Sequence, residues 1–428
     1  MKRPRPRPPS AQAAAAAIEL EIDFVGAQGD GVGRVDGRPV FVPLTLPGER
    51  VKARAAGERG ELEALLRPSR ERVTPPCPHF GPCGGCALQH WDHDHYLAWK
   101  VEQIRLTLAR ERIETGFAPA FAAAAGSRRR LALHARRRGQ RAAVGYKPRR
   151  SWDFLAIQTC PIADPRLVGA LPELRRLAEP LFEHPKSAPI LHVTLTATGL
   201  DVDITGVEAK SGGLSADARL RAAQAAEVGG FARVTLAGEI LYQARQPLVR
   251  FGPATVALPP GGFLQAVPAA EAAMAEFAVE AVRGAGRVAD LFCGAGAFTF
   301  RLAEAAAVTA LDAAEPAVRA LKAAIAGAPG LKPIVAEARD LFRRPLGALE
   351  MKGLDAVVFD PPWAGALDQA REIAASRVGV AVGVSCNPAT VARDARVLID
   401  GGFRLDQVLP VDQFLWSPHI ELVGVFRR

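Results

Sequence analysis

Residues 380–388 read V-A-V-G-V-S-C-N-P, and the rest of the chain is best understood from this segment. Its apolar, β-branched start predicts a buried strand of a parallel sheet, which stops at the polar residues S-C-N-P. Open α/β folds place their chemistry at the carboxyl ends of such strands. Cys386 is therefore a candidate nucleophile, although a buried cysteine also serves as an ordinary small apolar residue in many proteins.

Buried strands alternate with alanine-rich helices from about residue 257 onward. The strand predicted at 288–292 runs into C-G-A-G-A and then a helix from Phe298, which lets the backbone approach a nucleotide-like ligand. Acidic residues follow the next three predicted strands, at Asp312, Asp340 and Asp360. Without a phosphate-binding loop, this pattern fits a ligand with ribose and adenine but no triphosphate, such as S-adenosylmethionine. A dinucleotide-binding Rossmann domain is the alternative.

The charge distribution predicts an anionic partner. The 428 residues carry a net charge of +9, and 49% of them are apolar, which fits a soluble globular protein of two or three domains. Basic residues cluster at 128–130, 136–138 and 147–150, which favours nucleic acid over membrane; a solvated basic face is the alternative. No apolar run is long enough to span a bilayer and the amino terminus does not resemble a signal peptide, so we expect a cytoplasmic location. A monomer is expected.

Four regions are expected along the chain. Residues 1–16 are predicted to be a disordered basic tail. Short strands with glycine-rich turns, among them Asp36-Gly37, predict a small oligonucleotide-binding type of β-barrel at 17–70. Residues 71–255 read as a mixed α/β central domain, and residues 256–428 as the ligand-binding α/β domain. The expected fold class is therefore a multi-domain α/β protein with an amino-terminal barrel.

Three cysteines crowd into one loop, C-P-H-F-G-P-C-G-G-C, as Cys77, Cys83 and Cys86. Cys160, in Q-T-C-P-I, can complete a set of four thiols. In a cytosolic chain such a set is more typical of metal binding than of disulfides. From spacing alone, an iron–sulfur cluster and a structural zinc ion remain equally supported.

Taken in order, the motifs D-L-F-C-G-A-G-A-F, A-R-D-L-F, D-P-P, S-C-N-P-A-T and H-I-E resemble those of the RNA uracil-5-methyltransferases. The resemblance runs from about residue 18 to 426. The amino-terminal barrel is similar to the TRAM domain of that family, and the cysteine pattern to its iron–sulfur motif. This combination is most similar to the branch that acts on large-subunit ribosomal RNA, so ribosomal RNA is the expected substrate and transfer RNA the second choice.

The resemblance implies a role for each matching residue. It implies Cys386 as the nucleophile and Glu421 as the general base. It implies a [4Fe–4S] cluster held by Cys77, Cys83, Cys86 and Cys160. It also implies contacts to S-adenosylmethionine from Gln265, Phe292, Ala297, Asp312, Asp340 and Asp360.

Methylation of uracil at carbon 5 independently requires a nucleophile such as a thiol and a base. Carbon 5 of uracil is a weak nucleophile, so a thiolate such as that of Cys386 must first add to carbon 6. After methyl transfer, a base must remove the proton on carbon 5 so that the thiol can leave. Glu421 suits that role because it opens a final apolar strand, where a carboxylate is unusual unless it is paired or functional. An ordinary acid at a strand edge is the alternative.

Several positions depart from the family pattern. Trp363 follows D-P-P where the family usually has arginine, Val267 stands where asparagine is common, Ala297 replaces a polar residue, and Asp312 replaces glutamate. The D-P-P-W tetrapeptide also occurs in methyltransferases that act on the amino groups of adenine or cytosine, where the aromatic ring stacks on the base. That activity is one alternative, and a catalytically weakened RNA-binding factor is another.

Overall fold

The computed structural model describes residues 16–149, 151–210 and 212–428; the predicted basic tail therefore lies almost entirely outside the described residues. The chain forms two compact units. Among the described residues, one unit comprises 16–99 with 416–418, and the other comprises the remaining residues from 100 to 428. Throughout the described ranges, no helix has the length and apolar character needed to cross a membrane.

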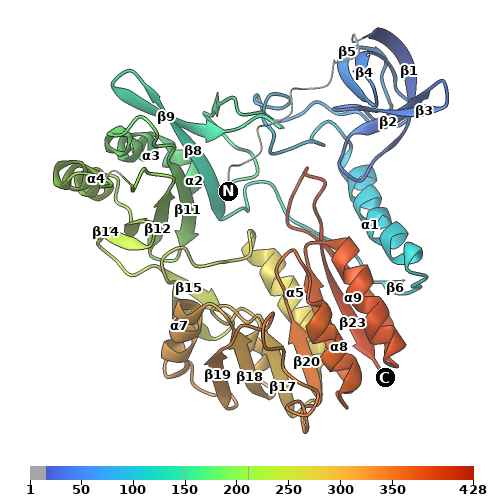
Figure 1. The fold of residues 1–428 in the computed structure, drawn as a ribbon, viewed down its shortest axis with the longest axis vertical. Coiled ribbons are helices and arrows are strands. Elements are labelled where there is room, and N and C mark those ends of the chain that lie inside the picture. Colours follow the sequence, from blue (N-terminus) through green and yellow to red (C-terminus); the bar gives the residue numbers. More distant parts are fainter. Residues whose placement is uncertain (1–15, 150, 211) are drawn as a thin grey trace, which may run out of the picture. The chain divides into compact units, whose positions relative to one another are not determined.

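The first unit contains a closed five-stranded barrel of order β1-β2-β3-β5-β4, drawn in blue in Figure 1. Its strands are β1 (Ala16–Val25), β2 (Gly31–Val35), β3 (Arg38–Val42), β4 (Arg50–Ala56) and β5 (Arg59–Arg67). The predicted hairpin turn joins β2 to β3, and both Asp36 (φ 50°) and Gly37 (φ 78°) adopt the left-handed backbone that a two-residue turn requires. The predicted barrel is confirmed.

A seven-stranded sheet with helices on one face forms the central part of the second unit. Its order is β10-β9-β8-β11-β12-β13-β14. The strands are β8 (Arg130–Arg138), β9 (Arg141–Tyr146), β10 (Leu155–Ala156), β11 (Ile190–Thr196), β12 (Gly199–Thr205), β13 (Arg233–Leu236) and β14 (Glu239–Gln243). Apolar side chains of this sheet pack with the helices α2 (Pro165–Gly169), α3 (Leu171–Ala178) and α4 (Ala216–Val228).

A second sheet of the same unit carries the order β19-β18-β17-β20-β21-β23-β22, extended at its far edge by β6 (Gly116–Phe117) and β7 (Phe121–Ala122). The strands are β17 (Arg287–Leu291), β18 (Ala307–Asp312), β19 (Ile334–Ala338), β20 (Ala356–Phe359), β21 (Val380–Ser385), β22 (Arg404–Asp412) and β23 (Glu421–Arg427). The first five are parallel, whereas β23 runs antiparallel between β21 and β22. The polar residues after Ser385 therefore follow a parallel strand, as predicted.

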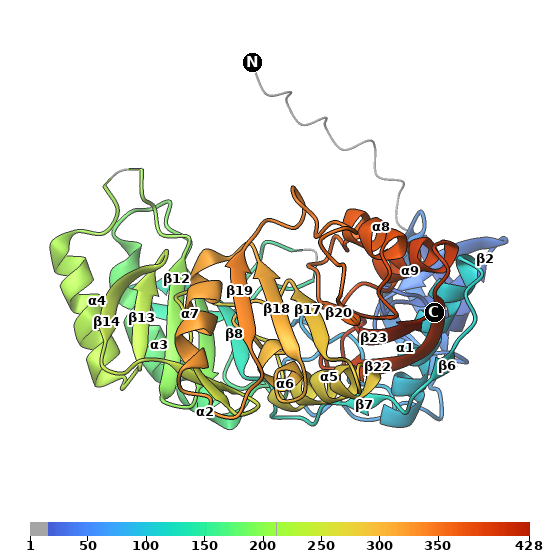
Figure 2. The ribbon, with the colours of Figure 1, turned by 90° about the horizontal axis from the view of Figure 1, so that it is seen from below.

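Helices cover both faces of this sheet, as Figure 2 shows. On one face, α5 (Pro268–Ala281), α6 (Thr299–Leu302) and α7 (Glu315–Ile325) pack on residues such as Val288 and Val358. On the other face, α8 (Leu367–Ala375), α9 (Pro388–Asp400) and the end of α1 (His93–Arg110) pack on residues such as Ala289 and Val357. Because neighbouring strand residues face opposite sides, the sheet has two apolar cores and its carboxyl edge is left for ligands.

Candidate active site

A cavity of about 630 Å³ opens where the parallel strands of the larger sheet end. Residues that follow β17, β18, β20 and β21 all line it, together with the first residue of β23. The lining side chains that matter below are Phe263, Gln265, Phe292, Asp312, Phe342, Asp360, Trp363, Cys386 and Glu421. The cavity is large enough for a nucleoside-sized ligand. The predicted nucleophile, the predicted base and four of the six predicted donor-binding residues therefore meet in one place.

Cys386 lies directly after β21, between the sheet and α9. The next residue, Asn387, caps α9 because its Oδ1 accepts the backbone N–H of Ala389 at 3.2 Å, and its Nδ2 donates to the Trp363 carbonyl at 3.1 Å. The thiol is partly buried. Burial, followed by the nearby carboxyl groups of Glu421 and Asp360, raises the pKa of Cys386 to about 12. At neutral pH the thiol is therefore protonated.

Glu421 is brought to this thiol by strand pairing. It opens β23, and the next residue, Leu422, is the register partner of Ser385 on β21. Glu421 is only 5% exposed. Burial and the charge of Asp360 raise the pKa of its carboxyl group to about 8, while a hydrogen bond from Gln413 acts in the opposite direction. A carboxyl group with a pKa near neutrality is well suited to accept a proton during catalysis.

Two buried glutamines connect the acidic groups of the site. Gln265 donates from Nε2 to Asp360 Oδ2 at 3.1 Å. Gln413 donates from Nε2 both to Gln265 Oε1 at 2.7 Å and to Glu421 Oε1 at 2.9 Å. Burial raises the pKa of Asp360 to about 7, against the lowering effect of the Gln265 hydrogen bond. Gln413 was not among the predicted site residues, because its burial and its bonds to Gln265 and Glu421 become visible only in the structure.

The predicted donor end of the cavity is built by the turn after β17. Phe292 has a left-handed backbone (φ 63°), and Gly294 donates its N–H to Asp312 Oδ2 at 2.8 Å. The second carboxylate oxygen of Asp312 accepts the N–H of Ala314 at 2.7 Å. The rings of Phe292 and Phe342 lie 5.6 Å apart, centroid to centroid. This arrangement offers apolar rings beside an acidic group, which suits an adenine joined to a ribose.

Two residues predicted to touch the donor do not line the cavity. Ala297 packs against the core, and its carbonyl accepts from the Arg301 guanidinium. Asp340 follows β19, but its carboxylate accepts the backbone N–H groups of Phe342 and Arg343 and so stabilises a turn. Phe342 reaches the cavity from that turn instead. The donor contacts of Ala297 and Asp340 remain predictions.

Trp363 stands at the mouth of the cavity with 54% of its surface exposed. Its ring meets the imidazole of His419 edge-on, with 5.9 Å between centroids. Val267, the other departure from the family pattern, is buried in the apolar core at the start of α5 and does not line the cavity. Of these two departures, only Trp363 changes the chemistry of the site.

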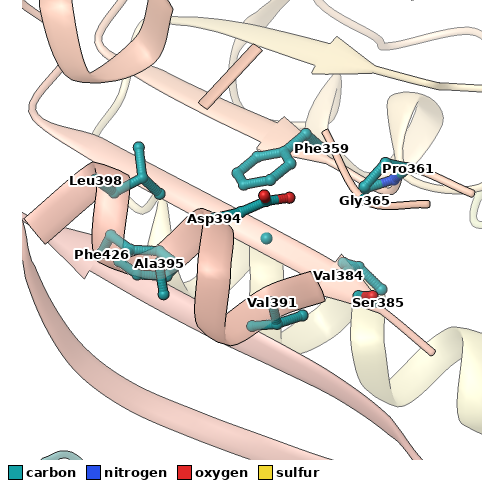
Figure 3. Close-up of a pocket in the computed structure, with 11 residues that line it drawn as sticks. Phe359, Pro361, Gly365, Val384, Ser385, Val391, Asp394, Ala395, Leu398 and Phe426 are labelled. Carbon is teal, nitrogen blue, oxygen red and sulfur yellow. The ribbon is translucent and has the colours of Figure 1, made fainter. Parts of the chain in front are cut away.

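Helix α9 holds the segment that carries Trp363. Asp394 accepts the backbone N–H of Ala366 at 2.8 Å, and Arg393 donates to the Ala364 carbonyl at 3.1 Å. Figure 3 shows the Asp394 carboxyl group beside the Phe359 ring, lining a second cavity of about 20 Å³. That volume suffices for one water molecule. The contacts tie the D-P-P-W segment to the helix that begins next to Cys386.

The cysteine loop belongs to the first unit and Cys160 to the second. Cys77, Cys83 and Cys86 are all partly buried, in a loop where the N–H of Cys83 donates to the carbonyl of His79. Across the part of the chain that the structure describes, no three histidine, cysteine, aspartate or glutamate side chains gather as a metal site. The predicted cluster is therefore not shown by the arrangement of these side chains.

Two family profiles match separate parts of this chain, and two RNA methyltransferases are similar to almost all of it. A family profile described as tRNA (Uracil-5-)-methyltransferase matches residues 257–428, and the TRAM domain profile matches residues 16–56. An uncharacterized RNA methyltransferase of Caulobacter vibrioides is 65% identical over 410 residues, which cover 95% of this chain and 99% of the relative. The 23S rRNA (uracil(1939)-C(5))-methyltransferase RlmD of Pectobacterium atrosepticum is 31% identical over 428 residues, covering 93% and 91%.

A solved structure has the same fold over nearly its whole length. It is the tRNA (uracil-54, C5)-methyltransferase of Pyrococcus abyssi in complex with S-adenosyl-L-homocysteine, with a TM-score of 0.74 and 22% identity. The match covers 95% of this chain and 99% of that one. The predicted fold class, an amino-terminal barrel followed by α/β domains of which the last is a methyltransferase domain, is confirmed. The chain belongs to the RNA uracil-5-methyltransferase family.

Proposed function

We propose that the chain methylates carbon 5 of a uridine in RNA, with Cys386 as the nucleophile and Glu421 as the general base. The observation that carries the proposal is the meeting of these two side chains in one cavity with the acidic strand ends of a methyltransferase fold. An amino-group methyltransferase needs neither a thiol nor a second buried base at this point. S-adenosylmethionine would supply an electrophilic methyl group, held by the cavity wall of Phe292, Asp312 and Phe342.

In the proposed reaction, Cys386 acts in the addition step and Glu421 in the later proton-removal step. The Cys386 thiol first gives its proton to solvent, and the thiolate adds to carbon 6 of the uracil, which makes carbon 5 nucleophilic. Carbon 5 would then attack the methyl group of the donor, and the broken carbon–sulfur bond would leave its electron pair on the donor's sulfur. Glu421 then takes the proton from carbon 5, the carbon 5–carbon 6 double bond forms again, and the Cys386 thiolate leaves. The high pKa of Cys386 means that the site must lower it when the substrates bind. A cationic donor beside Asp360 and Glu421 would offset their negative charge.

Features of the central sheet support RNA as the substrate. Trp152, in the β9–β10 loop, is 83% exposed, and Lys147 Nζ lies 4.4 Å from the centroid of its ring. On β8, Arg136 donates to the Trp152 carbonyl at 2.8 Å, and its guanidinium carbon lies 5.8 Å from the Phe154 ring centroid. An exposed ring beside cations binds single-stranded RNA by stacking on a base while the charges meet phosphates.

Ribosomal RNA is the RNA class we propose. The relative that acts on 23S rRNA aligns over nine-tenths of this chain, and it carries 31% identity. The solved structure named for transfer RNA is less similar in sequence, at 22% identity. The departure at Trp363 changes the cavity mouth, so we do not transfer a particular uridine.

The cysteines remain the proposed ligands of a [4Fe–4S] cluster, because four thiols are the donor set that iron–sulfur clusters use. Three of them occupy one short loop with glycines at 84 and 85, which lets the backbone bend around a bound group. No catalytic step passes through the cluster in our proposal. Replacing Cys83 with serine should abolish bound iron and sulfide in anaerobically purified protein; unchanged iron content would refute the assignment.

The test of function is the identity of the methylated nucleoside. The protein should be incubated with radiolabelled S-adenosylmethionine and ribosomal RNA transcribed in vitro, and the RNA then digested to nucleosides and separated by chromatography. We expect the label in 5-methyluridine. Label in N6-methyladenosine or N4-methylcytidine would instead support the amino-group activity that D-P-P-W suggests. Absence of label with ribosomal RNA and transfer RNA alike would favour a binding factor.

A further inference from the structure

We propose that Gln413 is a positioning residue for the proton-removing step, because its amide fixes which oxygen of Glu421 faces the substrate as the base. The inference rests on the proposed function, in which Glu421 takes the proton from carbon 5. It adds a residue that the sequence motifs do not mark. Gln413 follows β22, is only 2% exposed, and makes its three hydrogen bonds within the site.

The orientation of the Gln413 amide is decided by the backbone. Its Oε1 accepts the N–H of Ala266 at 2.9 Å. A backbone N–H can only donate, so a flipped amide would place two donors against each other and lose the bond. The Nε2 group must therefore face the opposite way, toward Gln265 Oε1 and Glu421 Oε1. Both of its hydrogens are then used.

This orientation makes the two oxygens of Glu421 unequal. Oε1 receives a hydrogen bond from Gln413, which occupies one of its lone pairs and lowers its basicity. Gln413 gives no such bond to Oε2, so Oε2 is the more basic oxygen, and we assign the catalytic proton to it. Gln413 also decides the orientation of the Gln265 amide, because Gln265 Oε1 accepts from Gln413 and Gln265 Nε2 then donates to Asp360 Oδ2. The backbone N–H of Ala266 thus determines, through the two glutamine amides, the hydrogen bonds that Glu421 and Asp360 receive.

A buried ion pair keeps Gln413 in place. Lys100 Nζ lies 2.6 Å from Asp412 Oδ1, and neither side chain has any exposed surface. Lys100 also donates to the Phe414 carbonyl at 3.1 Å, and Asp412 Oδ1 accepts the Phe414 N–H at 3.1 Å. The residues on both sides of Gln413 are therefore fixed from within the same unit. Its side chain has little freedom to leave Glu421.

The proposed step balances without another reactant. Glu421 Oε2 takes the proton of carbon 5, and the electron pair of that C–H bond becomes the carbon 5–carbon 6 double bond. The bond between Cys386 Sγ and carbon 6 breaks, and sulfur leaves with the electron pair as a thiolate. If Oε2 is turned away, thiol addition and methyl transfer still take place, but the covalent methylated RNA cannot be released. A defect in Gln413 should therefore appear late in the reaction.

The test compares Gln413→Met with Gln369→Met as a matched control. Gln369 is also a buried glutamine with both amide ends bonded, but to the backbone of Leu346 and away from Glu421. With RNA containing 5-fluorouridine, base action is impossible, so adduct formation reports only the early steps. Gln413→Met should form this adduct at the normal rate. With ordinary RNA it should accumulate a covalent methylated complex on denaturing gels, and kcat should fall about 10- to 100-fold, as expected for a hydrogen bond to a charged group.

The control separates positioning from general support of the fold. Gln369→Met should lower thermal stability without accumulating the complex. Parallel losses of fluorinated adduct and turnover in Gln413→Met would overturn the inference, and so would unchanged turnover. If the unmodified protein forms no adduct with fluorinated RNA, the proposed function fails first, and the inference with it.

A measurement on the unmodified protein remains decisive if Gln413→Met does not fold. The side-chain amide of Gln413 can be observed by nitrogen-15 NMR in labelled protein and assigned through its nuclear Overhauser contact with the backbone N–H of Ala266, which donates to Gln413 Oε1. Both Nε2 protons should exchange slowly with water, because each is held by a buried acceptor. Rapid exchange of either proton would overturn the inference.

Discussion

The reactivity of the Cys386 thiol follows from its surroundings and can be measured without RNA. Its pKa of about 12 lies about three units above the ordinary value of 9.0. At pH 8 the thiolate population is therefore about 1,000-fold lower than for an ordinary thiol. A thiolate with a higher pKa is intrinsically more nucleophilic, which offsets roughly 15- to 30-fold of that loss. Alkylation by iodoacetamide should be about 30- to 60-fold slower than for an ordinary thiol.

Replacing Glu421 with glutamine removes one of the causes that raise the pKa of Cys386. Burial is the largest cause of the raised pKa, and the charge of Glu421 comes next, ahead of that of Asp360. Glu421 itself has a pKa of about 8, so its charge acts on the thiol mainly above that pH. Glu421→Gln should therefore speed alkylation of Cys386 several-fold above pH 8. The gain should be smaller than the roughly 30- to 60-fold slowing described above, because burial and Asp360 still raise the pKa of the thiol. Glu239→Gln, on an exposed strand, is the matched control and should leave the rate unchanged.

The assay follows carbamidomethylation of the Cys386 peptide by mass spectrometry between pH 7 and 10. The other five cysteines are resolved by their own peptides. The rate should still be rising at pH 10, because the pKa lies well above that value. A plateau with a midpoint near 9, or a rate equal to that of a small thiol, would refute the reasoning that burial and the two carboxyl groups suppress the thiolate.

Three further outcomes are expected. Lys100→Met should destabilise the protein by about 3–5 kcal/mol in urea unfolding, because the buried Asp412 carboxylate then lacks the charge of Lys100. The double variant with Asp412→Leu should regain most of this stability. Equal free energies of unfolding for the unmodified protein and Lys100→Met would contradict the prediction. Trp152→Ala should weaken RNA binding about 5- to 100-fold, the worth of one stacked base, whereas Trp152→Phe should retain most affinity; equal filter-binding curves for all three proteins would remove Trp152 from the RNA surface. Glu421→Gln with ordinary RNA should retain a covalent methylated complex, and free methylated RNA at the normal rate would exclude Glu421 as the base.

Local sequence signals were sufficient where a structure is decided locally. The Asp36-Gly37 turn was predictable because both residues tolerate the left-handed backbone that they adopt. The strand before Cys386 was predictable because its residues are apolar and β-branched. The apolar run after Glu421 likewise predicted the final strand, which the structure begins at that residue.

Long-range pairing supplied what the sequence could not. The insertion of β23 beside β21 brings Glu421 next to Cys386, and nothing in either segment predicts that order. Gln413 bonds Gln265 across 148 positions, so its role depends on the tertiary structure. Asp340 was predicted to face the donor from its position after a strand. In the structure its carboxylate is used by the turn, and only the turn geometry decides that Phe342 reaches the cavity.

The most direct test of the central claim is a covalent trap on Cys386. Anaerobically purified protein should be incubated with S-adenosylmethionine and ribosomal RNA in which uridine is replaced by 5-fluorouridine, and the products separated on a denaturing gel. Fluorine on carbon 5 cannot be removed by a base, so the thioether to carbon 6 should persist. We predict a protein–RNA complex that maps to the Cys386 peptide and disappears in Cys386→Ala. A complex that survives in Cys386→Ala, or 5-methyluridine formed by that variant from ordinary RNA, would contradict the account.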